Sequence, residues 1–288
     1  MEYRKFGNTD MVLSAVGLGG LLAHYEGING HPPPEEKRRI YLRAAELGIN
    51  LFDTGYGDEV HIPEELKGLS EDRFFSLKVG APAAEDLEGL VDKHLANLRR
   101  DAIDILRVHH YAFVGDTALA ERVVQLKEAG KVRSLCLIRH MLADQEAYVE
   151  RGPEEEADAD LVIYNYVCRS QGPGIDLSAA AGKGVLIMKS LGGQWVSWED
   201  KAKTDWSAAP ESKVVELSPR GEGIRSELPL VYPIVSGPWS ELAEPGEIVP
   251  RTERAVSWVL ENKGVNTILI AFASVEELEE AVGVRELV

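Results

Sequence analysis

Short apolar runs alternate with longer amphipathic stretches along most of the chain. Eight runs have the length and composition of buried strands, and they are Val16–Leu18, Asn50–Asp53, Phe74–Lys78, Ile103–Val108, Val132–Ile138, Leu161–Tyr164, Gly184–Lys189 and Thr267–Ile270. Several are apolar on both faces, as strands between a barrel interior and an outer layer of helices are. The repeated strand–helix order predicts an α/β fold, a single (β/α)₈ TIM barrel over residues 1–288.

The stretches between the predicted strands carry helix signals. Glu35–Leu47 ends at Gly48 and Leu119–Ala129 ends at Gly130, as helices that close on a C′ glycine do. The other predicted helices are Glu85–Leu98, Arg251–Glu261 and Val275–Val282. Ahead of the barrel, Tyr3–Phe6 and Val12–Ala15 flank a polar Gly-Asn-Thr-Asp turn, which predicts an N-terminal β-hairpin.

One segment, residues 194–249, interrupts this alternation. It is rich in tryptophan, proline and glycine and has little helical periodicity. Because it follows the seventh predicted strand, it would lie on the C-terminal face, where barrel active sites are built. We therefore expect a long loop that covers the substrate. Its aromatic residues suit a sugar-like or apolar ring, or they pack the loop onto the barrel.

Composition and charge narrow the possible partners. With 44% hydrophobic and 27% charged residues the chain can form one large core, and its formal net charge of −17 disfavours nucleic acid and anionic membranes. No apolar stretch has the length of a membrane span, and the N-terminus lacks the apolar region of a signal peptide. The two cysteines, Cys136 and Cys168, form no CxxC pair. Reduced thiols and a cytoplasmic location are expected.

Four polar side chains lie where early predicted strands end. Asp53, Lys78 and His109 end or directly follow three of these strands, and Tyr56 comes just after the first of the three. The C-terminal ends of barrel strands converge on one rim, so these groups should lie together. An ammonium lowers the pKa of a phenol, a carboxylate holds the ammonium, and an imidazole orients a carbonyl. The cluster predicts acid–base chemistry, although Asp53 and Lys78 alone would equally suit a structural ion pair.

His109 and His110 are not expected to form a metal site. Adjacent residues of a strand point to opposite faces, so the two rings would not converge on one ion. No metal site is predicted.

The chain resembles the aldo-keto reductase family over nearly its whole length. The matching segments, in order, are MEYRKFGNTDMVLSAVGLGG, NLFDTGYGDE, FFSLKVG, LANLRRDAIDILRVHHY, GKVRSLCL, MKSLGG and AVSWVLENKGVNTILI. The resemblance implies the same barrel, NAD or NADP across its C-terminal rim, and interconversion of a small-molecule carbonyl and an alcohol by hydride transfer. It also implies catalytic roles for Asp53, Tyr56, Lys78 and His109. The family places its catalytic histidine five residues after the aspartate of this strand, here Asp104, so His109 is preferred to His110.

Further site residues follow from the same resemblance. The positions expected to bind the cofactor are Gly19, Arg139, Asn165, Lys189, Ser190, Leu191 and Ser274. The positions expected to contact substrate are His110, Tyr25 and Trp195. The sequence gives no indication of an oligomeric state.

Some positions depart from the family pattern. Asp53 and Tyr56 are three residues apart instead of the usual five, which indicates a two-residue deletion or, alternatively, a missing catalytic tyrosine. Ile138 and Arg139 replace a Ser-Asn pair that usually holds the nicotinamide carboxamide. Glutamates follow Ser274 where a basic residue usually stands, and they would repel an adenosine 2′-phosphate. NAD is therefore at least as well supported as NADP.

Three functions remain open at this point. The first, which we favour, is an NAD(P)-dependent oxidoreductase. The second is an enzyme on the same barrel with lost or altered cofactor binding, which would use Tyr56, Lys78 and His109 for elimination or isomerisation. The third is a non-catalytic binding protein, which the retained acid–base cluster disfavours. The first and second functions differ in cofactor binding, so the changed cofactor positions are the feature that discriminates between them.

Overall fold

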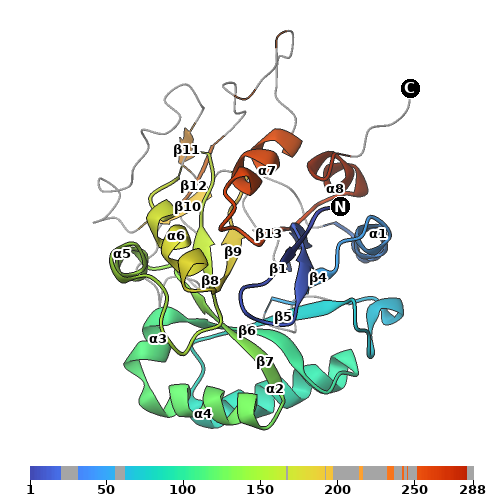
Figure 1. Ribbon diagram of the computed structural model, residues 1–288. Helices are drawn as coiled ribbons and strands as arrows, with labels where there is room; N and C mark the ends of the chain where they lie inside the picture. The colour runs from blue at the N-terminus through green and yellow to red at the C-terminus, as the bar shows by residue number, and fades with distance from the viewer. Residues whose placement is uncertain are drawn as a thin grey trace.

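The computed structural model describes residues 1–20, 32–55, 62–166, 168–191 and 252–283, positions 242 and 245, and the backbone of three short strands between residues 193 and 236. Its centre is a closed barrel of eight parallel strands in the order β13-β3-β4-β5-β6-β7-β8-β9 (Figure 1). The strands are β3 (Val16–Leu18), β4 (Leu51–Asp53), β5 (Phe74–Gly80), β6 (Ile103–His109), β7 (Val132–Ile138), β8 (Ala159–Ile163), β9 (Gly184–Met188) and β13 (Thr267–Ile270). The predicted (β/α)₈ barrel and all eight of its strands are confirmed.

Helices form a layer outside the barrel (Figure 1). Five match the predicted stretches, and they are α1 (Pro34–Glu46), α2 (Ala84–Leu98), α4 (Thr117–Glu128), α7 (Thr252–Glu261) and α8 (Val275–Ala281). Three further helices and a 3-10 turn were not predicted, and they are α3 (His110–Gly115), α5 (Leu142–Arg151), α6 (Gly172–Ala180) and η1 (Glu64–Leu66). The sequence of α6, GPGIDLSAA, begins with residues of low helix propensity, so its helical state depends on packing.

The predicted N-terminal hairpin is present and closes one end of the barrel. Strands β1 (Tyr3–Lys5) and β2 (Val12–Ser14) pair antiparallel. Phe6, Met11 and Leu13 of the hairpin are buried in one cluster with interior residues of the barrel strands. Gly7 has φ +52°, and a Cβ there would lie 2.5 Å from the backbone nitrogen of Gly184. The hairpin therefore packs at the N-terminal end of β9, away from the rim where the strands end.

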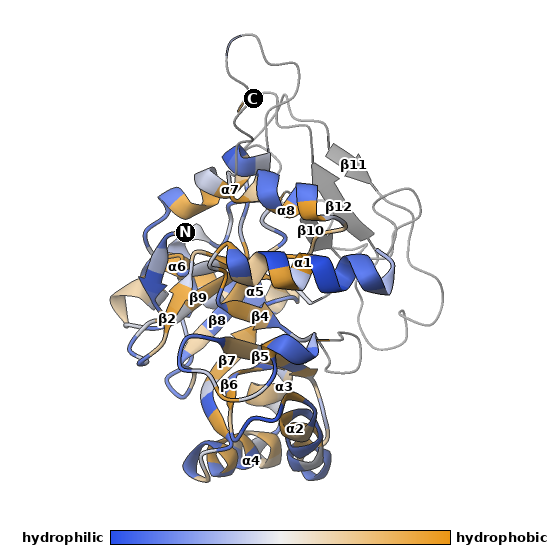
Figure 2. Ribbon diagram, turned by 90° about the vertical axis from the view of Figure 1, so that its right-hand side faces the viewer, coloured by the Kyte–Doolittle hydropathy of each residue, from blue (hydrophilic) through white to orange (hydrophobic). Residues whose placement is uncertain are grey.

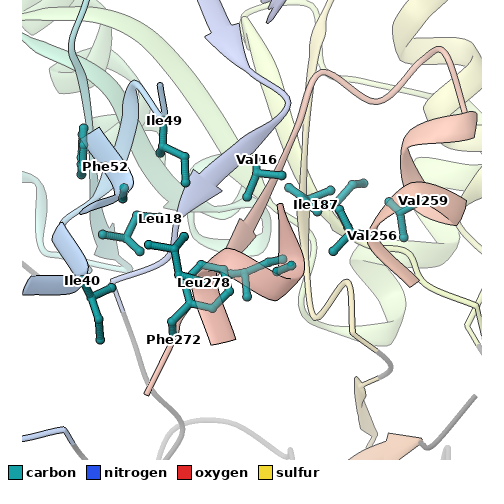
Figure 3. Packing of buried hydrophobic residues seen from close by; sticks show 14 of the residues in the cluster. Val16, Leu18, Ile40, Ile49, Phe52, Ile187, Val256, Val259, Phe272 and Leu278 are labelled. Atoms are coloured by element: carbon teal, nitrogen blue, oxygen red, sulfur yellow. The ribbon is translucent and has the colours of Figure 1, made fainter. Parts of the chain in front are cut away.

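The core has two layers that follow from alternation along each strand. In β4, Leu51 joins the barrel interior whereas Phe52 joins the cluster between the strands and the helices. Val16, Val256 and Leu278 belong to that same outer cluster (Figure 3). The strands are largely hydrophobic, and the helices mix hydrophobic and hydrophilic residues (Figure 2). Parity along a strand thus decides whether a side chain faces the barrel interior or the helices.

Part of the segment 194–249, which was predicted as a long loop, forms short strands. β10 (Gly193–Val196), β12 (Tyr232–Ser236) and β11 (Val214–Glu216) make an antiparallel sheet in that order. Pro233 lies one residue beyond the last position of β12 that pairs with β11, which explains how a proline is accepted in the middle strand. Most other residues of the segment lie outside the described residues, so its role over the substrate stays a prediction. Among the described helices, none is long and apolar enough to cross a membrane.

Candidate active site at the C-terminal rim

Three of the four residues of the predicted polar cluster, Asp53, Lys78 and His109, lie at the ends of β4, β5 and β6. Asp53 follows interior residue Leu51 by two positions, and His109 lies on the same face of β6 as interior residue Ile105. Lys78 is the register partner of Arg107 between β5 and β6. Parallel alignment of these strands therefore brings the carboxylate, the ammonium and the imidazole to one end of the barrel, as predicted.

Asp53 forms an ion pair that the sequence did not predict. Its Oδ1 accepts a hydrogen bond from Nη2 of Arg107 and another, at 2.8 Å, from the backbone N–H of Gly55. Both side chains of the pair are buried. The sequence suggested Lys78 as a partner of Asp53, and the structure shows Arg107 in that role. The missed signal was an arginine at an inward-facing position of an apolar strand, where a charge requires a partner.

Lys78 lies at an irregular point of the barrel. The register between β5 and β6 shifts between Lys78 and Gly80, where Gly80 has φ +70°. Such bulges re-aim a side chain at a sheet end. The positive charge of the ammonium contributes to lowering the pKa of both His109 and His140.

His109 is a buried, neutral imidazole. Burial, and then the positive charges of Lys78 and Arg107, lower its pKa to about 3. Its ring stacks on Tyr111 with centroids 5.3 Å apart, and its Nδ1 has no hydrogen-bond partner among the described residues. At neutral pH the ring can therefore donate or accept one hydrogen bond without carrying charge.

A second histidine, His140, belongs to the same site and was missed from the sequence. It lies two residues beyond the end of β7, and its ring centroid is 5.5 Å from that of His109. Burial, followed by Lys78 and Lys189, lowers its pKa well below the ordinary value. The sequence carries the same signal for His140 as for His109, a histidine at the end of a barrel strand or just after it.

Three predicted site residues cannot be placed. Tyr56 and Tyr25 lie outside the described residues, and for Trp195 only the backbone in β10 is described. Their roles remain predictions.

The predicted cofactor positions Asn165, Lys189 and Ser190 lie at the ends of β8 and β9. The Asn165 amide donates to the Lys189 carbonyl at 3.0 Å and accepts from the Cys168 N–H at 2.9 Å, so it joins the two strand ends. Lys189 has φ +56°, and the following Ser190 is buried with an Oγ that has no partner in the described part of the chain. An unsatisfied buried hydroxyl is costly, which points to a ligand group or water there.

The first strand contributes backbone at this rim. The N–H of Gly19 donates to the Ile270 carbonyl at 2.6 Å, and a Cβ on Gly19 would lie 2.9 Å from the Ala271 nitrogen. Gly19 is therefore required for close contact of β3 with β13. Leu191, also a predicted cofactor position, packs against the outer cluster.

Arg139 and His110 belong to an ionic network beside α5. The buried Arg139 guanidinium donates to Asp160 at 2.7 Å and lies over the Tyr148 ring. His110 contacts Asp144 through Nδ1 at 2.7 Å and Glu154 through Nε2 at 2.8 Å. Ile138, the residue before Arg139, faces the barrel interior, and adjacent residues of a strand point to opposite faces. The Arg139 side chain therefore lies against the helical layer, where it makes these contacts. The predicted cofactor role of Arg139 and substrate role of His110 stay predictions.

Carboxylates surround the turn before α8. The hydroxyl of Ser274 accepts from the Glu277 N–H at 3.2 Å, and the Glu277 carboxylate accepts from the Ala273 N–H at 2.8 Å. Ser274 therefore caps α8, and Glu277 reaches back to the N–H of the residue before the cap. Glu36 of α1 accepts from the Val275 N–H at 3.1 Å. Two backbone donors of this turn, those of Ala273 and Val275, are therefore occupied by carboxylates. Among the residues that the structure describes, no group of histidine, cysteine, aspartate or glutamate could hold a metal ion.

The barrel and the acid–base cluster at its C-terminal rim define a class of barrel enzymes, and the comparisons with known proteins identify the family. Residues 15–288 match the aldo/keto reductase family, and the chain belongs to this family. It is therefore an oxidoreductase, as the favoured interpretation of the sequence predicted.

Individual relatives are distant but similar over nearly their whole length. L-galactose dehydrogenase of Arabidopsis thaliana is 24% identical over 98% of this chain and 87% of its own length. Among solved structures, an aldo-keto reductase from Pseudomonas aeruginosa has a TM-score of 0.64 at 20% identity, covering 98% of this chain and 93% of that chain. One from Bacillus halodurans has a TM-score of 0.65 at 19% identity, covering 100% of this chain and 91% of that chain. These structures support the fold.

Proposed function

We propose that this protein is an NAD-dependent oxidoreductase that interconverts a carbonyl and an alcohol, with Tyr56 as the proton donor and acceptor. The observation that carries the proposal is the assembly of Asp53, Lys78 and His109 at one end of a barrel whose chain belongs to the aldo/keto reductase family. Such a cluster performs proton transfer at an oxygen atom.

Each residue has a distinct part in the proposed reaction. A bound nicotinamide supplies or accepts the hydride. In the reducing direction the Tyr56 hydroxyl gives its proton to the carbonyl oxygen as that oxygen becomes an alcohol, and the ammonium of Lys78 stabilises the phenolate that remains. The neutral ring of His109 donates a hydrogen bond to the same oxygen. Asp53 and Arg107 position the ends of β4 and β6 through their buried pair.

Some rim residues fit a nicotinamide cofactor. The Oγ of buried Ser190, which has no partner among the described residues, suits a polar group of the cofactor. Lys189 lies at the end of β9 and Gly19 at the end of β3, with β13 between these two strands. Ile138 offers only apolar contact, and the Asn165 amide is already used by backbone groups. Glu277 and Glu36 hold the turn before α8, which favours NAD, with a free ribose hydroxyl, over the 2′-phosphate of NADP.

The substrate of the curated relative suggests where to begin. That relative is an L-galactose dehydrogenase, so we propose polyhydroxylated alcohols and aldehydes as the first compounds to test. This choice agrees with the neutral hydrogen-bonding rings of the site.

Cofactor binding and turnover test the proposal. NADH and NADPH would be titrated into the purified protein while tryptophan fluorescence is followed, and oxidation of L-galactose with NAD⁺ would be measured by absorbance. We expect NADH to bind at least about tenfold more tightly than NADPH, a difference of about 1.4 kcal/mol. Tyr56→Phe should lower kcat by about 100-fold or more. Tyr3→Phe, on the exposed hairpin, is the matched control and should leave kcat unchanged.

Two results would overturn this proposal. Absence of binding by either cofactor at millimolar concentration would exclude the hydride reaction and favour the enzyme that uses the same cluster for elimination or isomerisation. Full activity of the Tyr56→Phe variant would show that another group transfers the proton.

A further inference from the structure

We propose that His140 is a substrate-binding residue that acts together with His109. The two rings hydrogen-bond two adjacent oxygen atoms of the substrate, so the site selects α-hydroxy carbonyl compounds and the vicinal diols formed from them. This inference rests on the proposed function, because it names the substrate class of the same site.

The two rings come from neighbouring strands and face each other. His109 is the register partner of Ile138 at the end of β7, and His140 lies two residues further along the chain. The ring centroids are 5.5 Å apart with an interplanar angle of 42°. Tyr111 stacks on His109 at 21° and limits its movement. The pair therefore forms part of the rim with a defined geometry.

Hydrogen bonding distinguishes these two histidines from the other two that the structure describes. The ring of His94 is bonded to the Thr54 hydroxyl at 2.9 Å, and the ring of His110 contacts two carboxylates. In the described part of the chain, by contrast, neither the ring of His140 nor Nδ1 of His109 has a hydrogen-bond partner. His109 is buried and His140 is partly buried, so these nitrogen atoms retain capacity to hydrogen-bond a ligand.

The charges around the pair decide which ligand chemistry suits it. Burial together with Lys78 lowers the pKa of both imidazoles, and Arg107 contributes in each case, so both rings are neutral at physiological pH. A neutral imidazole has one donor and one acceptor nitrogen. A hydroxyl group also donates and accepts, whereas a carboxylate only accepts. Two neutral rings therefore match hydroxyl and carbonyl oxygens better than an acid.

The spacing of the two rings suits two substrate oxygen atoms that are bound to neighbouring carbon atoms. Rings in contact reach two oxygen atoms that lie close together, as on neighbouring carbon atoms. In the proposed reaction His109 bonds the oxygen at the reacting carbon, which leaves His140 for the oxygen on the next carbon. A substrate without that second oxygen would leave the His140 nitrogens unsatisfied, which is the basis of selectivity.

Matched substrates and variants of His140 test this inference. Reduction of 2-hydroxypropanal and of propanal would be compared with NADH as cofactor. His140→Phe keeps a ring of similar size and removes the hydrogen bonds, and His140→Gln keeps a donor and an acceptor. We expect His140→Phe to raise KM for 2-hydroxypropanal about tenfold and to change KM for propanal less than about twofold. His140→Gln should restore KM for 2-hydroxypropanal to within about threefold.

The outcomes separate the inference from the proposed function. An equal change for the two aldehydes, or no change, overturns the role of His140 while the oxidoreductase function stands. If the wild-type protein reduces neither aldehyde, NMR of the histidine side chains decides the inference independently. Imidazole resonances of His140 that shift with 1,2-propanediol and not with 1-propanol support it, and resonances that do not respond to the diol overturn it.

Discussion

Arg107 is a buried charge within the site, and among the described residues it depends on a single ion pair with Asp53. It lies in β6 between interior residue Ile105 and His109, and its guanidinium pairs with Asp53 in a buried environment. Neither charge reaches water freely, so each one depends on the other. The pair also joins the ends of β4 and β6, which flank β5 and Lys78.

Removal of the arginine should therefore destabilise the protein strongly. We expect Arg107→Leu to lower the free energy of unfolding by about 3 kcal/mol, because Asp53 would remain buried and charged without its partner. The double variant Asp53→Asn/Arg107→Leu should recover part of this loss. Urea unfolding measures both. The control is Arg38→Leu, which breaks an exposed pair with Glu65 and should cost less than about 1 kcal/mol. Equal losses for Arg107→Leu and the control would contradict the assignment.

Helices α5 and α6 pack closely because a glycine of α6 leaves room for a tyrosine ring of α5. Gly174 of α6 faces the ring of Tyr148 in α5, and a Cβ at Gly174 would lie 2.2 Å from that ring. The Tyr148 hydroxyl is 2.8 Å from that of Ser178, and its ring also lies under Arg139. The contact fixes α6 in spite of the low helix propensity at its start.

A pair of glycine variants separates packing from helix propensity. Gly174→Ala should destabilise the protein by about 1–3 kcal/mol, because the added methyl group displaces Tyr148 from its place. Gly89→Ala in α2 is the control, since a Cβ there meets no atom within 4 Å. It should stabilise the protein by about 0.5–1 kcal/mol. Thermal or urea unfolding measures both, and a neutral Gly174→Ala variant would show that α5 and α6 are not closely packed.

At the scale of the whole molecule, the imidazoles of His109 and His140 make stability depend on pH. The ordinary histidine pKa is 6.5, and in the folded protein the pKa of His109 is about 3 and that of His140 is also far below the ordinary value. Below pH 6.5 the unfolded chain takes up protons that the folded protein does not bind. Stability is therefore present above pH 6.5 and is lost as the pH falls through this window.

This loss can be measured as a difference between proteins. In the window from pH 6.5 towards 3, His109 alone should lower the free energy of unfolding by about 1.4 kcal/mol for each pH unit. His109→Gln should remove that contribution and make the dependence less steep. Asp104 and Asp160, whose pKa burial raises, affect both proteins equally and cancel in the difference. Urea unfolding at several pH values provides the test, and parallel curves for the two proteins would contradict it.

The sequence by itself determined the barrel, because each of its signals is local. The eight strands, the hairpin and five helices follow from apolar periodicity and from glycine at helix ends, and all of them are present. The placement of Asp53, Lys78 and His109 together also follows, since residues at the ends of barrel strands meet at one rim. The helix α6 was missed because its own residues favour a turn.

The tertiary structure alone decided which groups pair. Arg107 is bound to Asp53 across an intervening strand, and His140 faces His109 from a neighbouring one. Both contacts depend on strand register and on closure of the barrel, which no short segment encodes. The direction of Arg139 towards Asp160, and the sheet within residues 194–249, depend on long-range packing in the same way. A side chain's partner in this protein is a property of the closed barrel, because the partners lie on different strands.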